Sequence, residues 1–138
     1  MIKTDIAYIA GIIDGEGCIS LCVNKYRKPR PFSYFIRVNV TNTNEWLCQW
    51  LKFALGGGVY HHPDPNPKHK SRWQWVLSSN EALAALKLIY PYLRLKKPQA
   101  ELAIKFQESR QGKRMKKEEL VLAEAQKILM NKLNKRGV

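Results

Sequence analysis

The strongest constraint on the fold is a period of two in the hydrophobic pattern. Apolar and polar residues alternate in residues 18–24, 33–41 and 72–78, and residues 59–62 are a shorter strand candidate. Alternation of this kind is typical of strands that bury one face and leave the other in water. Proline-rich polar turns join these segments in pairs. We therefore expect two antiparallel hairpins.

Segments with helical spacing of apolar residues separate the hairpins. We expect helices at residues 4–15, 45–55, 79–89 and 98–108. Side chains that can accept the unpaired N–H groups of a first turn precede three of them, namely Thr4 or Asp5, Asn42 or Asn44, and Ser78 or Ser79. The order predicts an α+β domain of the αββαββα type, with helices covering the apolar face of one four-stranded antiparallel sheet. The polar face is the expected working surface.

The length fits one domain. The chain has 138 residues, and an ordinary domain has roughly 100–200. We place the core at residues 1–110 and a basic helical extension of the same domain at residues 111–138. One side of this extension carries apolar residues that are expected to pack on the body, namely Leu120, Val121, Ala125, Ile128, Leu129 and Leu133.

The charge balance points to a polyanionic partner. Lys and Arg number 24 against 11 Asp and Glu, which gives a net charge of +13. A domain this basic attracts nucleic acid. No apolar run reaches the ~20 residues of a membrane-spanning helix, and the N-terminus lacks the pattern of a secretory signal. Because the three cysteines are an odd number, we expect reduced thiols in a soluble, intracellular protein with no membrane partner.

The end of the first predicted helix carries the most informative residues. Asp14 and Glu16 are separated and followed by glycines, which allow a sharp turn and a close approach to a ligand or another chain. Ala7, Gly11 and Asp14 share one helix face, where small side chains would let another helix come near. Glu16 can project into a cleft. One carboxylate is too few for a two-cation site, but a symmetric partner would supply a second.

The segment Ile9-Ala-Gly-Ile-Ile-Asp-Gly-Glu-Gly17 resembles the LAGLIDADG motif of homing endonucleases. Four positions match that motif letter by letter, namely Ala10, Gly11, Asp14 and Gly17. The order of elements and the segment Leu93-Arg-Leu-Lys-Lys-Pro-Gln-Ala100 are also similar to the family. The resemblance covers about residues 5–108.

This resemblance implies a saddle-shaped dimer whose motif helices pack at the symmetry axis and whose sheets lie in the major groove of DNA. A chain with one motif resembles the homodimeric branch, which cleaves long, pseudo-palindromic sites. The implied function is a site-specific double-strand DNA endonuclease that hydrolyses phosphodiester bonds with a divalent metal. Enzymes of this family serve intron or intein mobility.

The resemblance also implies a metal site. Glu16 corresponds to the acidic residue that binds the divalent metal, and the carbonyl of Gly15 is a further candidate ligand. The expected ion is Mg²⁺, for which Mn²⁺ or Ca²⁺ can substitute, Ca²⁺ without turnover. Asp14 is expected to pack and cap at the dimer seam.

Two further catalytic candidates follow from the resemblance. Lys96 occupies the place of a basic residue that assists catalysis, with Lys97 as a neighbouring candidate. Asn42 matches a polar residue of the solvent network around the attacking water, although it can equally be a helix cap. The arginine that often follows in relatives is missing, because Thr43, Asn44 and Glu45 stand there.

The polar strand faces predict how DNA would be read. Arg37 and Arg72 are candidates for guanine, and Asn39 and Gln74 for adenine. Weaker candidates of the same kind are Ser20, Asn24, Ser33 and His61. Cations of the two hairpin loops are expected to contact phosphates and set the affinity, namely Lys25, Arg27, Lys28, Arg30, Lys68 and Lys70.

Two rival interpretations remain open. The first is a nucleic-acid-binding protein that keeps the fold without cleavage, such as an intron-splicing maturase that binds intron RNA. The second is a structural ribonucleoprotein component, for which the positive charge alone would suffice. Cleavage of a target site with Mg²⁺, and its loss with EDTA, would separate these classes.

Overall fold

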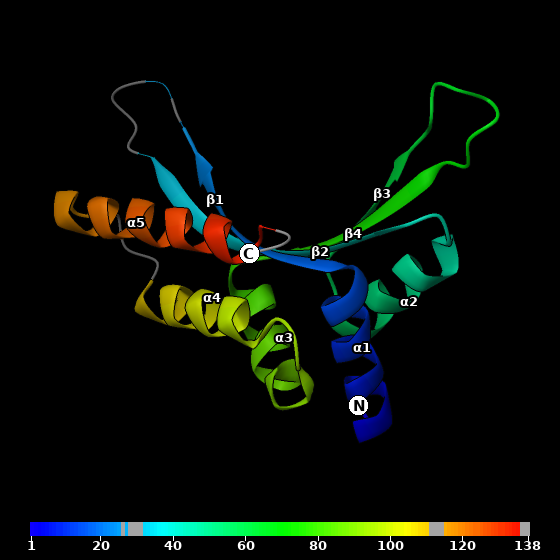
Figure 1. Cartoon of the computed structure of the whole chain (residues 1–138), viewed down its shortest axis with the longest axis horizontal. Coiled ribbons are helices and arrows are strands. Elements are labelled where there is room, and N and C mark those ends of the chain that lie inside the picture. Colours follow the sequence, from blue (N-terminus) through cyan, green and yellow to red (C-terminus); the bar gives the residue numbers. More distant parts are fainter. Residues whose placement is uncertain (26, 28–31, 111–114, 136–138) are drawn as a thin grey trace.

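Two hairpins joined through their inner strands form one four-stranded antiparallel sheet. The strands are β1 (Gly17–Asn24), β2 (Ser33–Asn42), β3 (Gly58–His62) and β4 (Arg72–Ser78), in the spatial order β1-β2-β4-β3. In this computed structural model, which describes residues 1–25, 27, 32–110 and 115–135, the hairpins rise on either side of the centre and the helices lie beneath (Figure 1). The sheet therefore has the curvature of a saddle.

The helices follow the predicted order. They are α1 (Lys3–Glu16), α2 (Glu45–Leu55), α3 (Ser79–Ile89), the short 3-10 helix η1 (Tyr90–Tyr92), α4 (Lys97–Ser109) and α5 (Lys117–Leu133). The α+β class and the αββαββα order are confirmed from α1 to α3, and η1, α4 and α5 follow. None of the helices in the described part of the chain is both long enough and apolar enough to cross a membrane.

The core lies between the sheet and the helices. The alternating apolar residues of the strands form its upper layer, with Ile19, Ile36, Val38 and Leu77 almost fully buried. Trp75 is fully buried, and its indole N–H donates to the carbonyl of Gly56 at 2.9 Å. Burial of each such side chain stabilises the fold by roughly 1.5–3 kcal/mol. The opposite face of the sheet is left for other contacts.

Helix caps follow the sequence only in part. Asn44 caps α2 as predicted, because its side chain accepts from the N–H of Leu47 at 3.3 Å. The predicted cap at Thr4 or Asp5 is wrong, since α1 begins at Lys3 after Ile2, which makes no side-chain cap bond. Burial of the apolar side of α1 substitutes for a cap there.

Gly17 makes the turn from α1 into β1 possible. Its N–H donates to the carbonyl of Ile13, and a Cβ at this position would lie 2.8 Å from the Ile13 Cα. Any larger residue would push the strand away from the helix end. This glycine therefore keeps Glu16, the last residue of α1, beside the start of β1.

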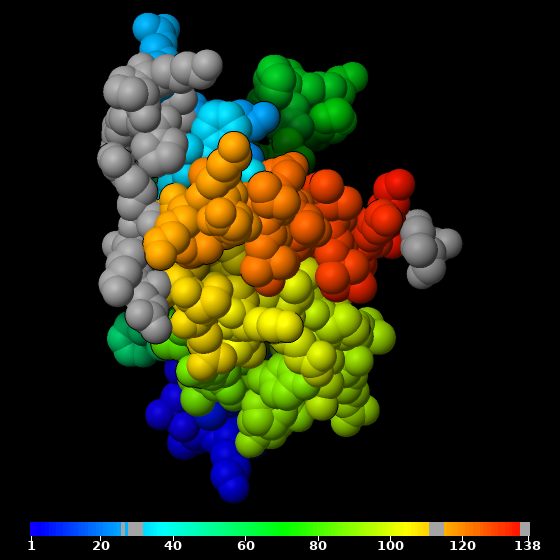
Figure 2. Space-filling view, turned by 90° about the vertical axis from the view of Figure 1, so that its left-hand side faces the viewer, coloured from blue at the N-terminus to red at the C-terminus, as the bar shows by residue number. Residues whose placement is uncertain are grey.

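The predicted packing face of the C-terminal extension is wrong in part. The buried residues of α5 are Ala123 and Met130, while Leu120 and Leu133 are half-buried. The remaining predicted residues are exposed, namely Val121, Ala125, Ile128 and Leu129. Figure 2 shows α5 lying across the surface above α4, so only one side of the helix reaches the body. The helix is apolar on two sides, and hydrophobicity alone did not show which one packs.

Candidate active site and nucleic-acid interface

The carboxylate of Asp14 joins the end of α1 to the segment before α4. Its oxygens accept from the backbone N–H groups of Arg94 at 2.8 Å, Leu95 at 3.2 Å and Lys96 at 3.0 Å. Hydrogen bonds to an ionised acceptor are roughly twice as strong as neutral ones. Asp14 thus caps a neighbouring segment of its own chain, and whether it also lies at a dimer seam stays a prediction.

Lys96 is held at the same helix end. Its ammonium donates to the main-chain carbonyl of Asp14 at 2.7 Å, where the carbonyls of the last turn of α1 carry partial negative charge. Lys97, the neighbouring candidate, lies with its ammonium 5.2 Å from the ring centre of Tyr90. Of the two lysines, only Lys96 is at the end of α1.

Glu16 and Asn42 contact each other directly. The side-chain amide of Asn42 donates to Glu16 Oε2 at 2.8 Å, and its Oδ1 accepts from the N–H of Asn44 at 2.8 Å. Asn42 is therefore not the cap of α2. It orients the exposed Glu16 carboxylate, which is the arrangement that the catalytic interpretation of Asn42 requires.

A cleft of about 820 Å³ is lined by Asp14, Glu16 and Lys96, whereas Asn42 lines a neighbouring pocket that shares Glu16 with it. Its walls include Gly15, Glu16 and Lys96, together with Asn39 and Thr41 of the polar sheet face. Cys18 also lines the cleft, and burial raises the pKa of its thiol although Lys96 and Arg37 act in the opposite direction. Of the sequence-predicted catalytic residues, Glu16 and Lys96 thus lie where the end of α1 meets the polar face, and Asn42 is connected to them by its hydrogen bond to Glu16.

The cleft offers oxygen ligands of the kind that a hard divalent cation prefers, but it offers few of them. Asp14 already accepts three backbone N–H groups, which leaves the Glu16 carboxylate and the Gly15 carbonyl. Within the described ranges, no cluster of three or more His, Cys, Asp or Glu side chains could hold a metal. Mg²⁺ prefers oxygen ligands and keeps several waters or substrate oxygens. These oxygens fit part of a Mg²⁺ coordination shell that water or substrate oxygens complete.

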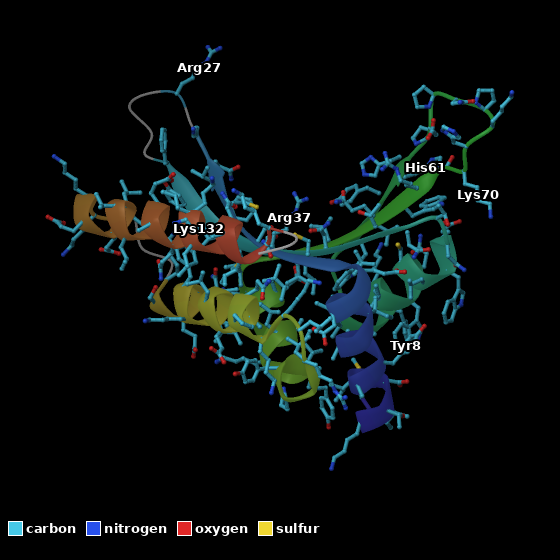
Figure 3. The ribbon with its side chains drawn as sticks, in the orientation of Figure 1. Tyr8, Arg27, Arg37, His61, Lys70 and Lys132 are labelled. Atoms are coloured by element: carbon cyan, nitrogen blue, oxygen red, sulfur yellow. The ribbon has the colours of Figure 1, made fainter. Side chains whose placement is uncertain are left out.

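The register of the strands arranges the polar face in rows. Arg37 lies opposite Ser20 and Ser78, Asn39 opposite Cys18, and Thr41 opposite Gln74. Figure 3 shows Arg37 projecting from the centre of the sheet, on the side away from the helices. The Nε of Arg37 is buried and, within the described part of the chain, has no hydrogen-bond partner. An unpaired buried donor of this kind is rare in folded proteins.

Comparison with known proteins extends this description. The sequence matches no protein-family model and no curated protein. By structure, 99% of the chain superposes on 86% of the homing endonuclease I-CvuI, solved in complex with DNA, with a TM-score of 0.81 and 17% identity. The archaeal intron-encoded homing endonuclease I-Vdi141I, solved with DNA, gives 98% and 87% coverage, a TM-score of 0.79 and 18% identity.

A third structure carries the motif in its name. The LAGLIDADG homing endonuclease I-SmaMI, bound to cleaved DNA, matches with a TM-score of 0.72 and 17% identity, over 95% of this chain but only 45% of that one. The chain has the LAGLIDADG homing endonuclease fold. In this fold, one copy of the present chain has the size of about half of I-SmaMI.

One predicted base contact is placed differently within the LAGLIDADG fold. His61 lies opposite Trp73 and stacks on it with ring centres 4.3 Å apart, so both are on the face opposite Gln74. The expectation that His61 points the same way as Gln74 is wrong. Tyr60 and His62 take that side instead, and a His62 ring nitrogen lies 3.2 Å from Gln74 Oε1. The sequence missed them because β3 lacks a clear alternation.

The hairpin ends of the LAGLIDADG fold carry the expected cations. Figure 3 shows Arg27 and Lys70 near the outer ends of the two hairpins. Lys25 lies with its ammonium 5.8 Å from the ring centre of Phe32. Lys28 and Arg30 lie outside the described residues. Lys68, Arg72, Asn24 and Ser33 remain predictions for DNA contact.

Helix α1 presents a second, exposed side. Its buried side holds Ile6, Ile9, Ala10 and Ile13, whereas Ala7 and Gly11 are exposed, and a Cβ built on Gly11 meets nothing within 4 Å. An exposed aromatic group lies next to this side: Tyr8 packs edge-on against Trp50, which stacks on Trp46. Sequence reasoning missed this aromatic group, although Trp46 and Trp50 are four residues apart on one helix.

Proposed function

We propose that the chain is a site-specific double-strand DNA endonuclease of the homing type, which acts as a homodimer on a long pseudo-palindromic site. The observation that carries the proposal is the cleft at the end of α1. It brings the Glu16 carboxylate and the Lys96 ammonium together beside the polar face of a curved sheet. The I-CvuI and I-SmaMI structures with DNA have the same fold.

The substrate follows from shape and charge. A strand of ~7 residues at ~3.3 Å each spans about 23 Å, which is roughly 7 base pairs at ~3.4 Å. Arg37 and Arg72 suit guanine edges, and Asn39 and Gln74 suit adenine edges. The net charge of +13 favours a polyphosphate backbone. Loops at the hairpin ends extend the reach beyond each strand.

Two features support the homodimer: one copy lacks a second carboxylate to pair with Glu16, and one side of its helix α1 is exposed. Two carboxylates line the cleft, but that of Asp14 already accepts three backbone N–H groups, so a second copy is needed to pair with Glu16. The exposed side of α1, with Ala7 and Gly11, allows close approach of a second α1. Tyr8 and Trp46 flank this side and supply apolar area of the kind found at interface centres. Two such copies would bring their Glu16 side chains toward a common axis.

Glu16, with the carbonyl of Gly15, is the proposed ligand set for a divalent cation. Mg²⁺, when bound, supplies Lewis-acid stabilisation of the phosphate and activation of water. Mn²⁺ would support the same reaction, and Ca²⁺ would fill the site without turnover. Two I-CvuI complexes were solved in the presence of Mg and Ca.

Lys96, Asp14 and Asn42 place charged groups around the proposed site of cleavage. Lys96 places a cation where negative charge develops on the phosphate oxygens during attack. The carbonyl of Asp14 fixes that cation, and the three N–H bonds of the Asp14 carboxylate fix the segment that carries it. Asn42 holds one oxygen of Glu16 by donating to it. The site is thus ordered before DNA arrives.

The test begins with selection of bound sequences from a pool of random DNA duplexes. The selected site is placed in a supercoiled plasmid and incubated with the protein and Mg²⁺, Ca²⁺ or EDTA. We expect double-strand cleavage with Mg²⁺, and binding without cleavage with Ca²⁺. Selection should give a pseudo-palindrome. Binding with no nicking under any divalent metal would reject the enzyme, and preference for a structured RNA would favour a maturase-like role.

A further inference from the structure

Helix α5 has an apolar stripe on the side that faces away from the body. Ala123 and Met130, the buried residues of the helix, lie on its opposite side. At about 100° per residue, the positions of the stripe fall within about 120° of the helix circumference. The apolar stripe consists of five exposed residues, namely Val121 (68% exposed), Leu122 (60%), Ala125, Ile128 (49%) and Leu129 (47%).

Contacts on the other sides of α5 fix the rotation of the helix about its own axis. The Tyr34 hydroxyl of β2 donates to the Glu124 carboxylate at 2.6 Å. Asn134, which follows the last residue of α5, donates its side-chain amide to the carbonyl of Ile19 on β1 at 2.9 Å. Because these bonds hold the middle and the end of the helix, the apolar stripe cannot turn toward the body without breaking them.

The apolar stripe is separate from the surfaces that the proposed function uses. Much of α5 lies on the side of the molecule away from α1 (Figure 1), and its outer surface is open in Figure 2. Among the described residues that line the cleft, none belongs to the stripe. A continuous apolar patch that a chain leaves exposed marks an interaction site. The cleft and the exposed side of α1 do not account for this one.

The apolar stripe is self-complementary when two copies of α5 run antiparallel with Ala125 at the centre. Positions at equal distances from Ala125 on either side then face each other. Val121 faces Leu129, and Leu122 faces Ile128, so each large apolar side chain meets another. The small side chain of Ala125 lets the helix axes approach to about 8 Å, the lower end of the range for packed helices.

Charges at the two ends of the apolar stripe follow the same symmetry. Glu118 is exposed in the first turn of α5, and Lys132 is exposed in its last turn. Both are equally far from Ala125, so an antiparallel partner places each glutamate beside a lysine of the other copy. Within the described residues, neither has an ion-pair partner of its own. A parallel arrangement would bring like charges together.

We propose that the apolar stripe of α5 binds the same stripe of a second copy of this chain in an antiparallel, two-fold contact. The occupant is a second copy because one helix supplies both halves of the complementary pattern. The contact is additional to the α1 contact of the proposed homodimer, so it joins homodimers into larger assemblies. Two helices of about 26 Å form a small interface, and we expect a Kd of roughly 10–100 µM.

Sedimentation equilibrium of the full chain without DNA measures this association. Gly11→Arg should block the close approach of two α1 helices and keep the fold, because a Cβ at Gly11 meets nothing within 4 Å. In this background we expect a monomer–dimer equilibrium through α5. Leu122→Gln should weaken it at least about tenfold, because each interface loses the leucine side chain twice. The matched control is Leu88→Gln, an exposed leucine of α3, which should change nothing.

Charge reversal tests the antiparallel orientation in the same background. Glu118→Lys should weaken the association about tenfold, because two attractive pairs become repulsive. The double variant Glu118→Lys/Lys132→Glu should restore it, since the exchange keeps opposite charges facing each other. In a parallel pair like charges would meet in every one of these variants, and the double variant would restore nothing.

The outcomes are independent of the test of cleavage. Monomers alone in the Gly11→Arg background at about 500 µM, or equal association of Leu122→Gln and Leu88→Gln, would overturn the α5 contact and leave the proposed function standing. Dimers of the wild type that Leu122→Gln abolishes and Gly11→Arg does not would support the α5 contact and contradict the α1 homodimer. Circular dichroism checks folding, and Leu129→Gln repeats the test at a second position if Leu122→Gln unfolds.

Discussion

The two carboxylates at the end of α1 face two different regions of the molecule. Asp14 turns inward and accepts three backbone N–H groups of the segment before α4. Glu16, two residues later, is exposed at the cleft, with the Asn42 amide on one oxygen. Two acids of similar chemistry therefore have opposite expected roles, because one is saturated by its own chain and the other is not. Mutations should separate stability from cleavage at these two positions.

The largest expected effect is on cleavage by Glu16→Gln. The amide keeps an acceptor for Asn42 but removes the negative charge that a divalent cation needs. We expect cleavage of the selected site to fall by at least about 100-fold, with binding kept in Ca²⁺-free buffer. The free energy of unfolding should change by less than about 0.5 kcal/mol, because the side chain is exposed. Wild-type turnover by this variant would refute the metal-ligand role.

Asp14→Ala should have its largest effect on stability. Removal of the carboxylate leaves the N–H groups of Arg94, Leu95 and Lys96 without their acceptor. Because water can reach this half-buried site and replace part of the lost bonding, we expect the free energy of unfolding, measured in urea, to fall by about 2 kcal/mol. Asp14→Asn keeps one carbonyl acceptor and should lose less. Equal stability of Asp14→Ala and wild type would show that the contact between α1 and this segment is dispensable.

Asn42 and Asn44 extend the comparison between cleavage and stability to the residue that contacts Glu16 and to the residue that caps α2. Asn42→Ala removes the donor to Glu16, and we expect cleavage about tenfold slower, the cost of one lost hydrogen bond to a charged group. Asn44→Ala removes the cap of α2 and should cost about 1 kcal/mol of stability while cleavage continues at the wild-type rate. Single-turnover cleavage and thermal unfolding, measured on both variants, decide this. Reversed results would exchange the two roles.

The smallest effect concerns a third carboxylate, Glu124 on α5. The Tyr34 hydroxyl donates to Glu124 at 2.6 Å, and burial together with this contact raises the pKa of Tyr34 to about 12. A raised folded-state pKa means that this stabilisation is complete below pH 10, the usual tyrosine pKa, and is lost as the pH rises toward 12. Absorbance titration at alkaline pH should show Tyr34 ionising near pH 12, while Tyr90, whose pKa is raised by its hydrogen bond to Glu101, should also ionise above pH 10.

Two variants assign that tyrosine. Tyr34→Phe should remove the titration near pH 12, and Glu124→Gln should lower the pKa of Tyr34, because the negative charge is gone. Neither variant should change cleavage, since the pair lies between β2 and α5, away from the cleft. A tyrosine that still titrates near pH 12 in Tyr34→Phe would contradict the assignment.

The sequence predicted the sheet and its two faces well because alternation is a local property. Each strand is within one residue of its expected bounds, and Arg37, Asn39 and Gln74 share the polar face. Prediction failed for His61, because β3 is too short to show a period and its orientation is set by pairing with β4. The side of α5 that packs was missed for a similar reason, since a helix apolar on two sides does not reveal its partner.

The candidate site could be predicted only where a motif named the residues. Glu16, Lys96 and Asn42 came from the resemblance, and their proximity required the fold, which brings Glu16 and Lys96 into one cleft although 80 positions separate them. No local pattern indicated the bonds from Asp14 to the segment before α4. Almost every residue has a backbone N–H group, so the sequence does not show which of them a carboxylate will bind. The contact of Asn134 with Ile19 spans 115 positions and was equally invisible.

The most direct test of the account is a crystal structure of the protein with its selected duplex and Ca²⁺. The account predicts two copies related by a two-fold axis through the exposed sides of α1, with both Glu16 carboxylates binding Ca²⁺ at the phosphates to be cleaved. A single copy on the duplex, or two copies joined elsewhere with their Glu16 side chains far apart, would contradict it.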